Sequence, residues 1–422
     1  MIIFYVLVSL MPFLRPPFLS RVISAEVAFK VVGLVCVPYA LYRLGSRGGL
    51  PPYFRTRQAR LFVLLYAIAA LSHLGNIMTL HLYSLYFLSL TSFLGLFFIT
   101  LSIVDSLPRL RWVLFAANVG VALGSIRVVE EWRQTGARAG LMVGDSNYFA
   151  TSAVLALPFA FLMVLHCKKR WERLCYGACL ALSLIGVTLC ESRGGTLALG
   201  VAFLYLVARS RRRVRNLMLI GGLVVPLMVF SPTSPLQRFL HPGADEESSN
   251  QAHLIAWKAG LRMIAAHPLA GVGLGNFKWV IRRFMDDADE QKREALWRQG
   301  VNAATIAHNT YLEVAAELGL PALAVFASIL FFVYRSLERA SKRARAVGSV
   351  FLYDAARGLQ AGFVGFLVGG CTISAEYTKF LWLVVFLSMC LPQLLSFHRT
   401  PQHAKPASSL AHMQAWGNVS FR

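Results

Sequence analysis

The feature that most constrains this chain is a series of long apolar runs that carry no charge. Residues 174–190 and 217–231, for example, contain no Asp, Glu, Lys or Arg. A helix needs about 20 apolar residues to cross a bilayer, and the runs are continuous rather than alternating, which excludes a β-barrel. Of 422 residues, 56% are hydrophobic and only 15% are charged. The sequence therefore predicts an all-α polytopic membrane protein.

About twelve transmembrane helices are predicted from these runs. Their approximate bounds are 1–14, 25–43, 61–80, 84–104, 112–127, 148–166, 174–190, 194–208, 217–231, 309–334, 350–371 and 380–397. The N-terminal run lacks the basic residues that precede a cleaved signal peptide, so it is interpreted as a first span.

Lys and Arg occupy alternate gaps between the spans. The basic gaps are 43–60, 109–111, 168–173, 209–215, 335–345 and the tail after residue 398. By contrast, 126–147 holds three basic and three acidic residues, and 232–307 holds nine and eight. Because Lys and Arg concentrate in cytoplasmic loops, both termini are expected in the cytoplasm and 232–307 outside it. The net charge of +22 is then a topology signal, and no nucleic-acid partner is expected.

This topology divides the chain into four parts. Residues 1–231 hold helices 1–9, 232–307 form one large outward loop, 308–398 hold helices 10–12, and 399–422 form a cytoplasmic tail. Within the loop, apolar residues recur at helical spacing and predict an amphipathic helix on the membrane surface or on the bundle: Leu254, Trp257, Leu261 and Ile264. The dipeptide His267-Pro268 is expected to end this helix.

Polar residues from three distant segments are predicted to share one depth, near the outer face. Arg193 lies in ESRGG between two spans, Asp145 and Asn147 lie in GDSNYFA, and His308 precedes the span at 309–334. Ionisable groups at membrane depth are costly and tend to be functional. Arg193 is a candidate for binding a phosphate or diphosphate, with a loop arginine paired to Glu191 as the alternative.

His308 is a candidate general base because a histidine titrates near neutral pH. Glu313 follows about a turn and a half later and is a candidate to orient it; an interfacial histidine is the alternative. Asp145 and Asn147 are candidates for ligand contact, although Asp-Ser-Asn also has the composition of a helix N-cap. Glu317, one turn past Glu313 and inside the span, requires a partner that the sequence does not identify.

The glycine-rich run GVGLGNF at 271–277 is interpreted as a tight turn, because no strand precedes it and no Walker-type lysine follows. Arg282 is a candidate phosphate contact beyond the run, or else a solvated residue near Asp286 and Asp287. No H-E-x-x-H, DxD or His/Cys ligand cluster occurs. No metal site and no cofactor are therefore expected, and arginines would stabilise a diphosphate in place of a divalent cation.

Four segments, in this order, resemble the O-antigen ligase and Wzy-type polymerase superfamily: GDSNYFA, ESRGG, AHPLAGVGLGNF and AHNTYLEVAAELGLPAL. The resemblance implies a GT-C-like glycosyltransferase of the bacterial inner membrane, with its active site and large loop in the periplasm. It implies transfer of a glycan from undecaprenyl diphosphate to a lipid A core oligosaccharide, or to another lipid-linked glycan in a polymerase. His308 matches the family's proposed base, and Arg193 matches its proposed diphosphate-binding arginine.

The chain departs from the family pattern at one position. Many members have an arginine four residues before the loop tryptophan, whereas here His253 precedes Trp257. Either a protonated His253 takes that role, or Arg262 or Arg238 supplies the charge. A transporter of lipid-linked sugars is the alternative from another class, but its charged sites would lie near the midplane rather than at one face.

Overall fold

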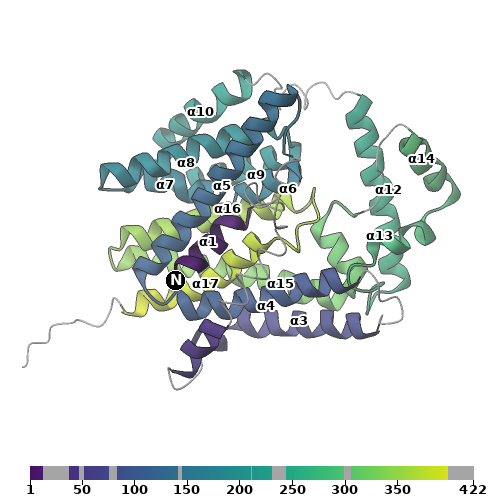
Figure 1. The fold of residues 1–422 in the computed structure, drawn as a ribbon, viewed down its shortest axis with the longest axis horizontal. Coiled ribbons are helices and arrows are strands. Elements are labelled where there is room, and N and C mark those ends of the chain that lie inside the picture. Colours follow the sequence, from purple (N-terminus) through teal and green to yellow (C-terminus); the bar gives the residue numbers. More distant parts are fainter. Residues whose placement is uncertain are drawn as a thin grey trace, which may run out of the picture.

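The computed structural model describes residues 1–12, 38–46, 52–75, 83–140, 145–210, 212–230, 244–298 and 306–397. Throughout these ranges the regular elements are helices (Figure 1). Most of the predicted span at 25–43 and the predicted tail at 399–422 lie outside the described residues.

The helices follow the predicted spans in order. They are α1 (Ile2–Leu10), η1 (Pro52–Arg55), α3 (Arg57–Gly75), α4 (Tyr83–Ile103), α5 (Leu107–Thr135), α6 (Ser146–Ala153), α7 (Leu157–His166), α8 (Arg170–Leu189), α9 (Arg193–Ala208), α10 (Arg213–Phe230), α12 (Ala244–Ala266), α13 (Phe277–Val280), η3 (Ile281–Phe284), α14 (Asp287–Arg298), α15 (Thr310–Ala346), α16 (Val350–Gly369) and α17 (Lys379–Phe397). Helices α12, α13 and α14 belong to the predicted loop and lie together on the right of Figure 1.

Four helical segments of the described chain are long and apolar enough to cross a membrane. They are α5, the α6–α7 unit Ser146–His166, α8 and α15, and parts of α4, α9 and α17 form shorter apolar helices. This supports a multi-pass membrane protein, while the number of twelve spans remains a prediction. Both α5 and α15 run well beyond the predicted spans 112–127 and 309–334, because Arg, Lys and Glu continue a helix readily outside lipid.

The bundle has a basic end that gathers the predicted cytoplasmic gaps in space. The Arg111 guanidinium lies 4.6 Å from the centre of the Phe351 ring, and His166 Nδ1 lies 2.9 Å from the carboxylate of Asp354. Arg209 forms an ion pair of 2.6 Å with Glu338. These contacts bring residues in or beside the gaps at 109–111, 168–173 and 209–215 against the end of α15 and the first half of α16.

Helix α16 packs closely against α7 and α9 through glycines. A Cβ atom built on Gly358 would lie 2.6 Å from the backbone of Phe159, and one on Gly362 would lie 2.7 Å from the carbonyl oxygens of Val154 and Leu155. One on Gly365 would lie 2.4 Å from the oxygen of Ala198. Small residues at membrane helix interfaces allow backbones to approach in this way.

This packing predicts that Gly362→Ala destabilises the protein although alanine favours helices. The added methyl should cost about 1–3 kcal/mol because backbone atoms have to move. Gly200→Ala in α9 is the matched control, since nothing lies within 4 Å of a Cβ there, and it should be neutral or stabilising. Thermal unfolding in detergent measures both, and equal melting temperatures would contradict the close packing of α16.

Candidate functional site

Each of the three predicted polar segments caps the N-terminus of a helix. Asp145 accepts a hydrogen bond from Tyr148 N at 2.7 Å at the start of α6, and Ser192 accepts one from Gly195 N at 3.1 Å at the start of α9. Asn309 accepts from the amides of Tyr311 and Leu312 at 3.1 Å at the start of α15. Side-chain capping of this kind fixes where a helix begins, so these motifs position the first residues of three helices.

The starts of α9 and α15 are joined by the turn between α16 and α17. Thr310 N donates to Gly370 O at 2.8 Å and to Ile373 O at 3.0 Å. On the α9 side, a Cβ on Gly194 would lie 2.1 Å from the hydroxyl of Thr372. The glycine after Arg193 is therefore required for close approach of this turn, and the turn brings the N-terminal ends of α9 and α15 together.

Arg193 reaches from α9 to the loop helix α12. Its guanidinium donates to Asn250 Oδ1 at 2.8 Å. Asn250 was not predicted as a site residue; the signal was its spacing, since residues 250, 253 and 257 fall on one side of a helix. The bond joins two segments 57 residues apart in the sequence.

His253 and His308 lie against each other. Their ring centroids are 4.4 Å apart and the ring planes are inclined by 33°. Neither ring forms a hydrogen bond to another residue of the described ranges. Since Arg193 is bonded to Asn250, one turn before His253 on α12, Arg193, His253 and His308 form one cluster. Burial, together with His308 and the charge of Arg193, lowers the pKa of His253 to about 4.

Burial also lowers the pKa of His308 below its usual value, so both imidazoles are neutral at pH 7. A neutral His253 does not supply the positive charge that the family's arginine would. The positive charge close to the two neutral rings is that of Arg193.

The backbone before His308 is fixed on both sides. Trp257 Nε1 donates to Ala307 O at 2.9 Å, and Ala307 N donates to a carboxylate oxygen of Glu313 at 3.2 Å. His308 itself has a φ of +48°, which is uncommon for a residue with a side chain and is often found at functional sites. Glu313 therefore contacts the chain next to the imidazole rather than the ring, and its other described partner is the Ser374 hydroxyl.

The partner of Glu317 is the glycine-rich run. Its carboxylate accepts hydrogen bonds from Gly275 N at 2.8 Å, Phe277 N at 3.2 Å and the Tyr377 hydroxyl at 3.1 Å. In addition, Val272 N and Gly273 N donate to backbone oxygens of α15. The run is a turn that binds an internal carboxylate, as expected of a tight turn and not of a nucleotide loop.

The same turn crosses a kink in α15. Gly319 has a φ of +84° inside this helix, and a Cβ there would lie 2.3 Å from Leu269 O. Leu320 N then donates to Pro268 O at 2.8 Å. The loop is thus held by the Leu320 amide, which the kink frees from the helix, and by the carbonyl oxygens of Ala316 and Glu317, of which the latter loses its helical donor because Pro321 has no N–H.

The loop has its own small core beside α15. The buried members from α12 are Ala252, Ile255, Ala256, Ala259 and Met263, and they pack with Phe277, Ile281 and Leu296. The apolar stripe that identified the helix lies partly outside this core, since Leu254 and Leu261 are 54% and 60% exposed. The packed face combines three alanines with Ile255 and Met263, and a Cβ on Gly260 would lie 3.0 Å from Leu312 of α15.

The remaining predicted residues are placed outside the cluster or in internal contacts. Arg262 is paired with Asp286 at 2.6 Å and Asp289 at 3.3 Å, and Arg282 is paired with Glu290 at 2.7 Å. Asn147 accepts from Arg138 at 2.8 Å. Arg238 lies outside the described residues. Within the described ranges, no three His, Cys, Asp or Glu side chains are grouped to hold a metal ion.

Comparison with known proteins supports the resemblance. Residues 178–327 match the protein-family model described as O-antigen ligase, a segment that includes Arg193, the loop helices, His308 and the kink of α15. The match supports the predicted resemblance to the O-antigen ligase and Wzy-type superfamily over this part of the chain. No curated protein matches the sequence.

The contacts of Glu317 predict that Glu317→Leu loosens the turn at 271–277. Two backbone amides and a hydroxyl would lose their acceptor, and each buried unsatisfied group costs roughly 1–3 kcal/mol. Amide hydrogen exchange at Gly275 and Phe277 should be at least about tenfold faster. Glu294→Leu on the exposed side of α14 is the control; unchanged exchange at 271–277 in Glu317→Leu would show that the carboxylate does not hold the turn.

Proposed function

We propose that this chain is an O-antigen ligase-like glycosyltransferase of the bacterial inner membrane, acting on its periplasmic side. It would transfer a glycan from undecaprenyl diphosphate to a lipid A core oligosaccharide. The observation that carries the proposal is the meeting of Arg193, His253 and His308, from three distant segments, at one end of the bundle. The match of residues 178–327 to the O-antigen ligase family supports the class of reaction.

Arg193 would bind the donor diphosphate. A guanidinium presents several donors in a planar fork that suits phosphate oxygens. Its described bond to Asn250 uses one nitrogen, Nη2, which leaves the others for a ligand. The capped N-terminus of α9 lies directly behind the side chain and adds favourable potential for an anion.

His308 would act as the general base. Burial keeps its imidazole neutral near pH 7, and a ring nitrogen takes the proton of the acceptor hydroxyl. The acceptor oxygen then bonds to the anomeric carbon of the donor as the bond from that carbon to the diphosphate oxygen breaks. Undecaprenyl diphosphate leaves with both electrons of that bond, stabilised by Arg193. Displacement in line predicts inversion at the anomeric carbon, without a metal ion.

A Wzy-type polymerase is the second candidate, because the same family and site serve both reactions. The two differ in the acceptor, which would be another lipid-linked glycan in a polymerase. A transporter of lipid-linked sugars is the third, and the placement of His308 and Arg193 at one end of the bundle disfavours it.

We expect His308→Ala and Arg193→Ala each to lower glycan transfer by at least about a hundredfold, as is usual for loss of a general base or a charge-stabilising donor. Purified protein is incubated with an undecaprenyl-diphosphate-linked glycan and lipid A core oligosaccharide, with EDTA present throughout. His267→Ala and Arg133→Ala, which remove the same side chains from exposed positions, are the matched controls.

The size of the product identifies the reaction. Glycan joined to core supports the ligase, whereas longer lipid-linked glycan supports the polymerase. Full transfer by His308→Ala or Arg193→Ala would contradict the assignment of the site. A requirement for an added divalent ion would overturn the metal-free mechanism.

The lowered pKa of His308 predicts the acid limb of the pH profile. The base must be neutral to accept a proton, so kcat/KM should stay high at pH 6.5, the usual pKa of a histidine. It should fall only at lower pH, as His308 becomes protonated. His253→Ala should move this limb to higher pH, because removing the adjacent ring exposes His308 to water. A limb that stays in place in His253→Ala would show that the two rings do not interact in the active protein.

A further inference from the structure

A second polar cavity lies at the basic end of the bundle, remote from Arg193 and His308. Its volume is about 530 Å³, and five arginines line it: Arg209, Arg212, Arg215, Arg345 and Arg357. They come from the ends of α9 and α15, the start of α10 and the first half of α16. Helix α9 separates Arg193 from Arg209 by 16 residues, or roughly 24 Å at 1.5 Å per residue, so the two sites lie at opposite ends.

The charge of this cavity is only partly balanced. Glu338 accepts from Arg209 at 2.6 Å and from Arg357 at 3.0 Å. Asp354, the one carboxylate that lines the cavity, lies against His166 at 2.9 Å. Arg212 and Arg345 are exposed, and neither guanidinium group has a hydrogen bond or an ion pair with another residue of the described ranges.

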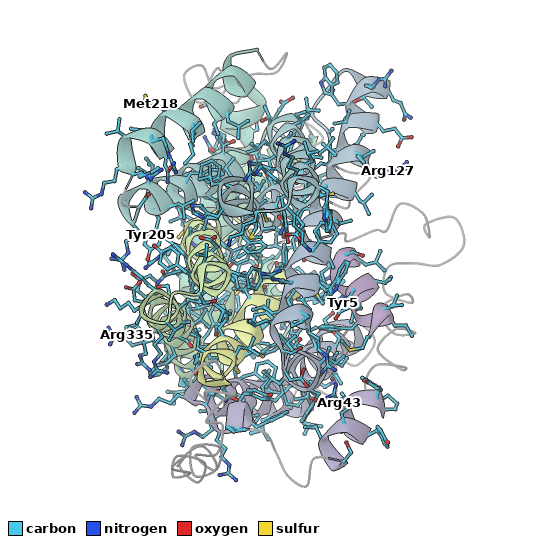
Figure 2. The ribbon with its side chains drawn as sticks, turned by 90° about the vertical axis from the view of Figure 1, so that its left-hand side faces the viewer. Tyr5, Arg43, Arg127, Tyr205, Met218 and Arg335 are labelled. Atoms are coloured by element: carbon cyan, nitrogen blue, oxygen red, sulfur yellow. The ribbon has the colours of Figure 1, made fainter. Side chains whose placement is uncertain are left out.

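The lining also has an apolar part, beside the polar residues His166, Ser210, Asn216 and Ser349. Leu162, Leu165, Leu206, Val350 and Tyr353 contribute to the wall, so the cavity combines guanidinium groups with a hydrocarbon surface. Figure 2 looks toward this end of the bundle, and nitrogen-tipped side chains lie along the edge between the labelled residues Tyr205 and Arg335. A soluble phosphate would use the guanidinium groups alone, whereas a membrane lipid would use both surfaces.

We propose that this cavity binds the phosphate of an anionic membrane lipid, held mainly by Arg212 and Arg345. The basic end is the predicted cytoplasmic end of the bundle, where anionic headgroups are attracted to pockets between helices. The bound lipid would tie the turn between α9 and α10 to the turn between α15 and α16. The site is separate from the proposed glycan transfer and does not depend on it.

Native mass spectrometry of the detergent-purified full chain tests this proposal with cardiolipin, phosphatidylglycerol and phosphatidylcholine as probes. Cardiolipin and phosphatidylglycerol should be retained and phosphatidylcholine lost. The double variant Arg212→Gln/Arg345→Gln should bind the anionic lipids about thirtyfold more weakly, on the scale of about 1 kcal/mol for each basic residue near an anionic headgroup.

The matched control removes equal charge from the same turns. Arg213→Gln/Arg343→Gln changes exposed residues that do not line the cavity and should bind as the unchanged protein does. Arg212→Lys/Arg345→Lys, which keeps the charge, should retain most of the binding and shows that the positions tolerate substitution.

Three outcomes would overturn the proposal. Equal loss of lipid in both Gln variants would assign binding to general surface charge. Displacement of the lipid by millimolar inorganic phosphate or glycerol 3-phosphate would assign the cavity to a soluble phosphate. Equal retention of phosphatidylcholine would remove the role of the anionic headgroup.

Discussion

The position of the loop on the bundle depends on the hydrogen bonds that two buried glutamates of α15 accept. Glu313 and Glu317 are buried near the start of α15, where an unpaired carboxylate would be strongly destabilising. Their carboxylate oxygens accept hydrogen bonds from the backbone amides of Ala307, Gly275 and Phe277 and from two hydroxyls in the turn before α17. The need to satisfy these groups attaches the loop to the bundle, and the position of His308 follows from that attachment.

Local patterns in the sequence predict the features that depend on neighbouring residues. They do not predict which distant segments contact each other. The cap at Asp145 follows from residue type and position, and GVGLGNF is identified as a turn because the features of a nucleotide loop are missing. The acceptor bond of Asn250, the turn that carries Thr372 and the partners of Glu317 are not predictable in this way, because they join segments far apart in the chain. Arg262 and Arg282 illustrate the same limit: both are candidates for phosphate contact in the sequence, but the fold places Asp286, Asp289 and Glu290 beside them.

The two ends of the bundle carry positive charge in different arrangements. At the proposed catalytic end, the guanidinium of Arg193 stands beside two neutral imidazoles, and the loop arginines at 262, 282 and 293 are paired with carboxylates. At the basic end, arginines exceed carboxylates and two of them have no described partner. The first arrangement suits a single anionic group in a defined pose, and the second suits headgroups attracted by the overall field. Helices α9, α15 and α16 connect the two ends.

The presence of histidine rather than arginine at position 253 affects the pKa of His308. An arginine there would place a permanent charge against a ring whose centroid is 4.4 Å from that of residue 253, and a like charge nearby lowers the pKa of a histidine further. A base with a much lower pKa takes a proton from a sugar hydroxyl less readily. In the proposed mechanism, the neutral imidazole of His253 would instead shield His308 from water, so that burial alone lowers the pKa of His308, and Arg193 would bind the diphosphate. In the proposed mechanism, histidine at position 253 would bind an anion less strongly than arginine but would lower the pKa of the neighbouring base less.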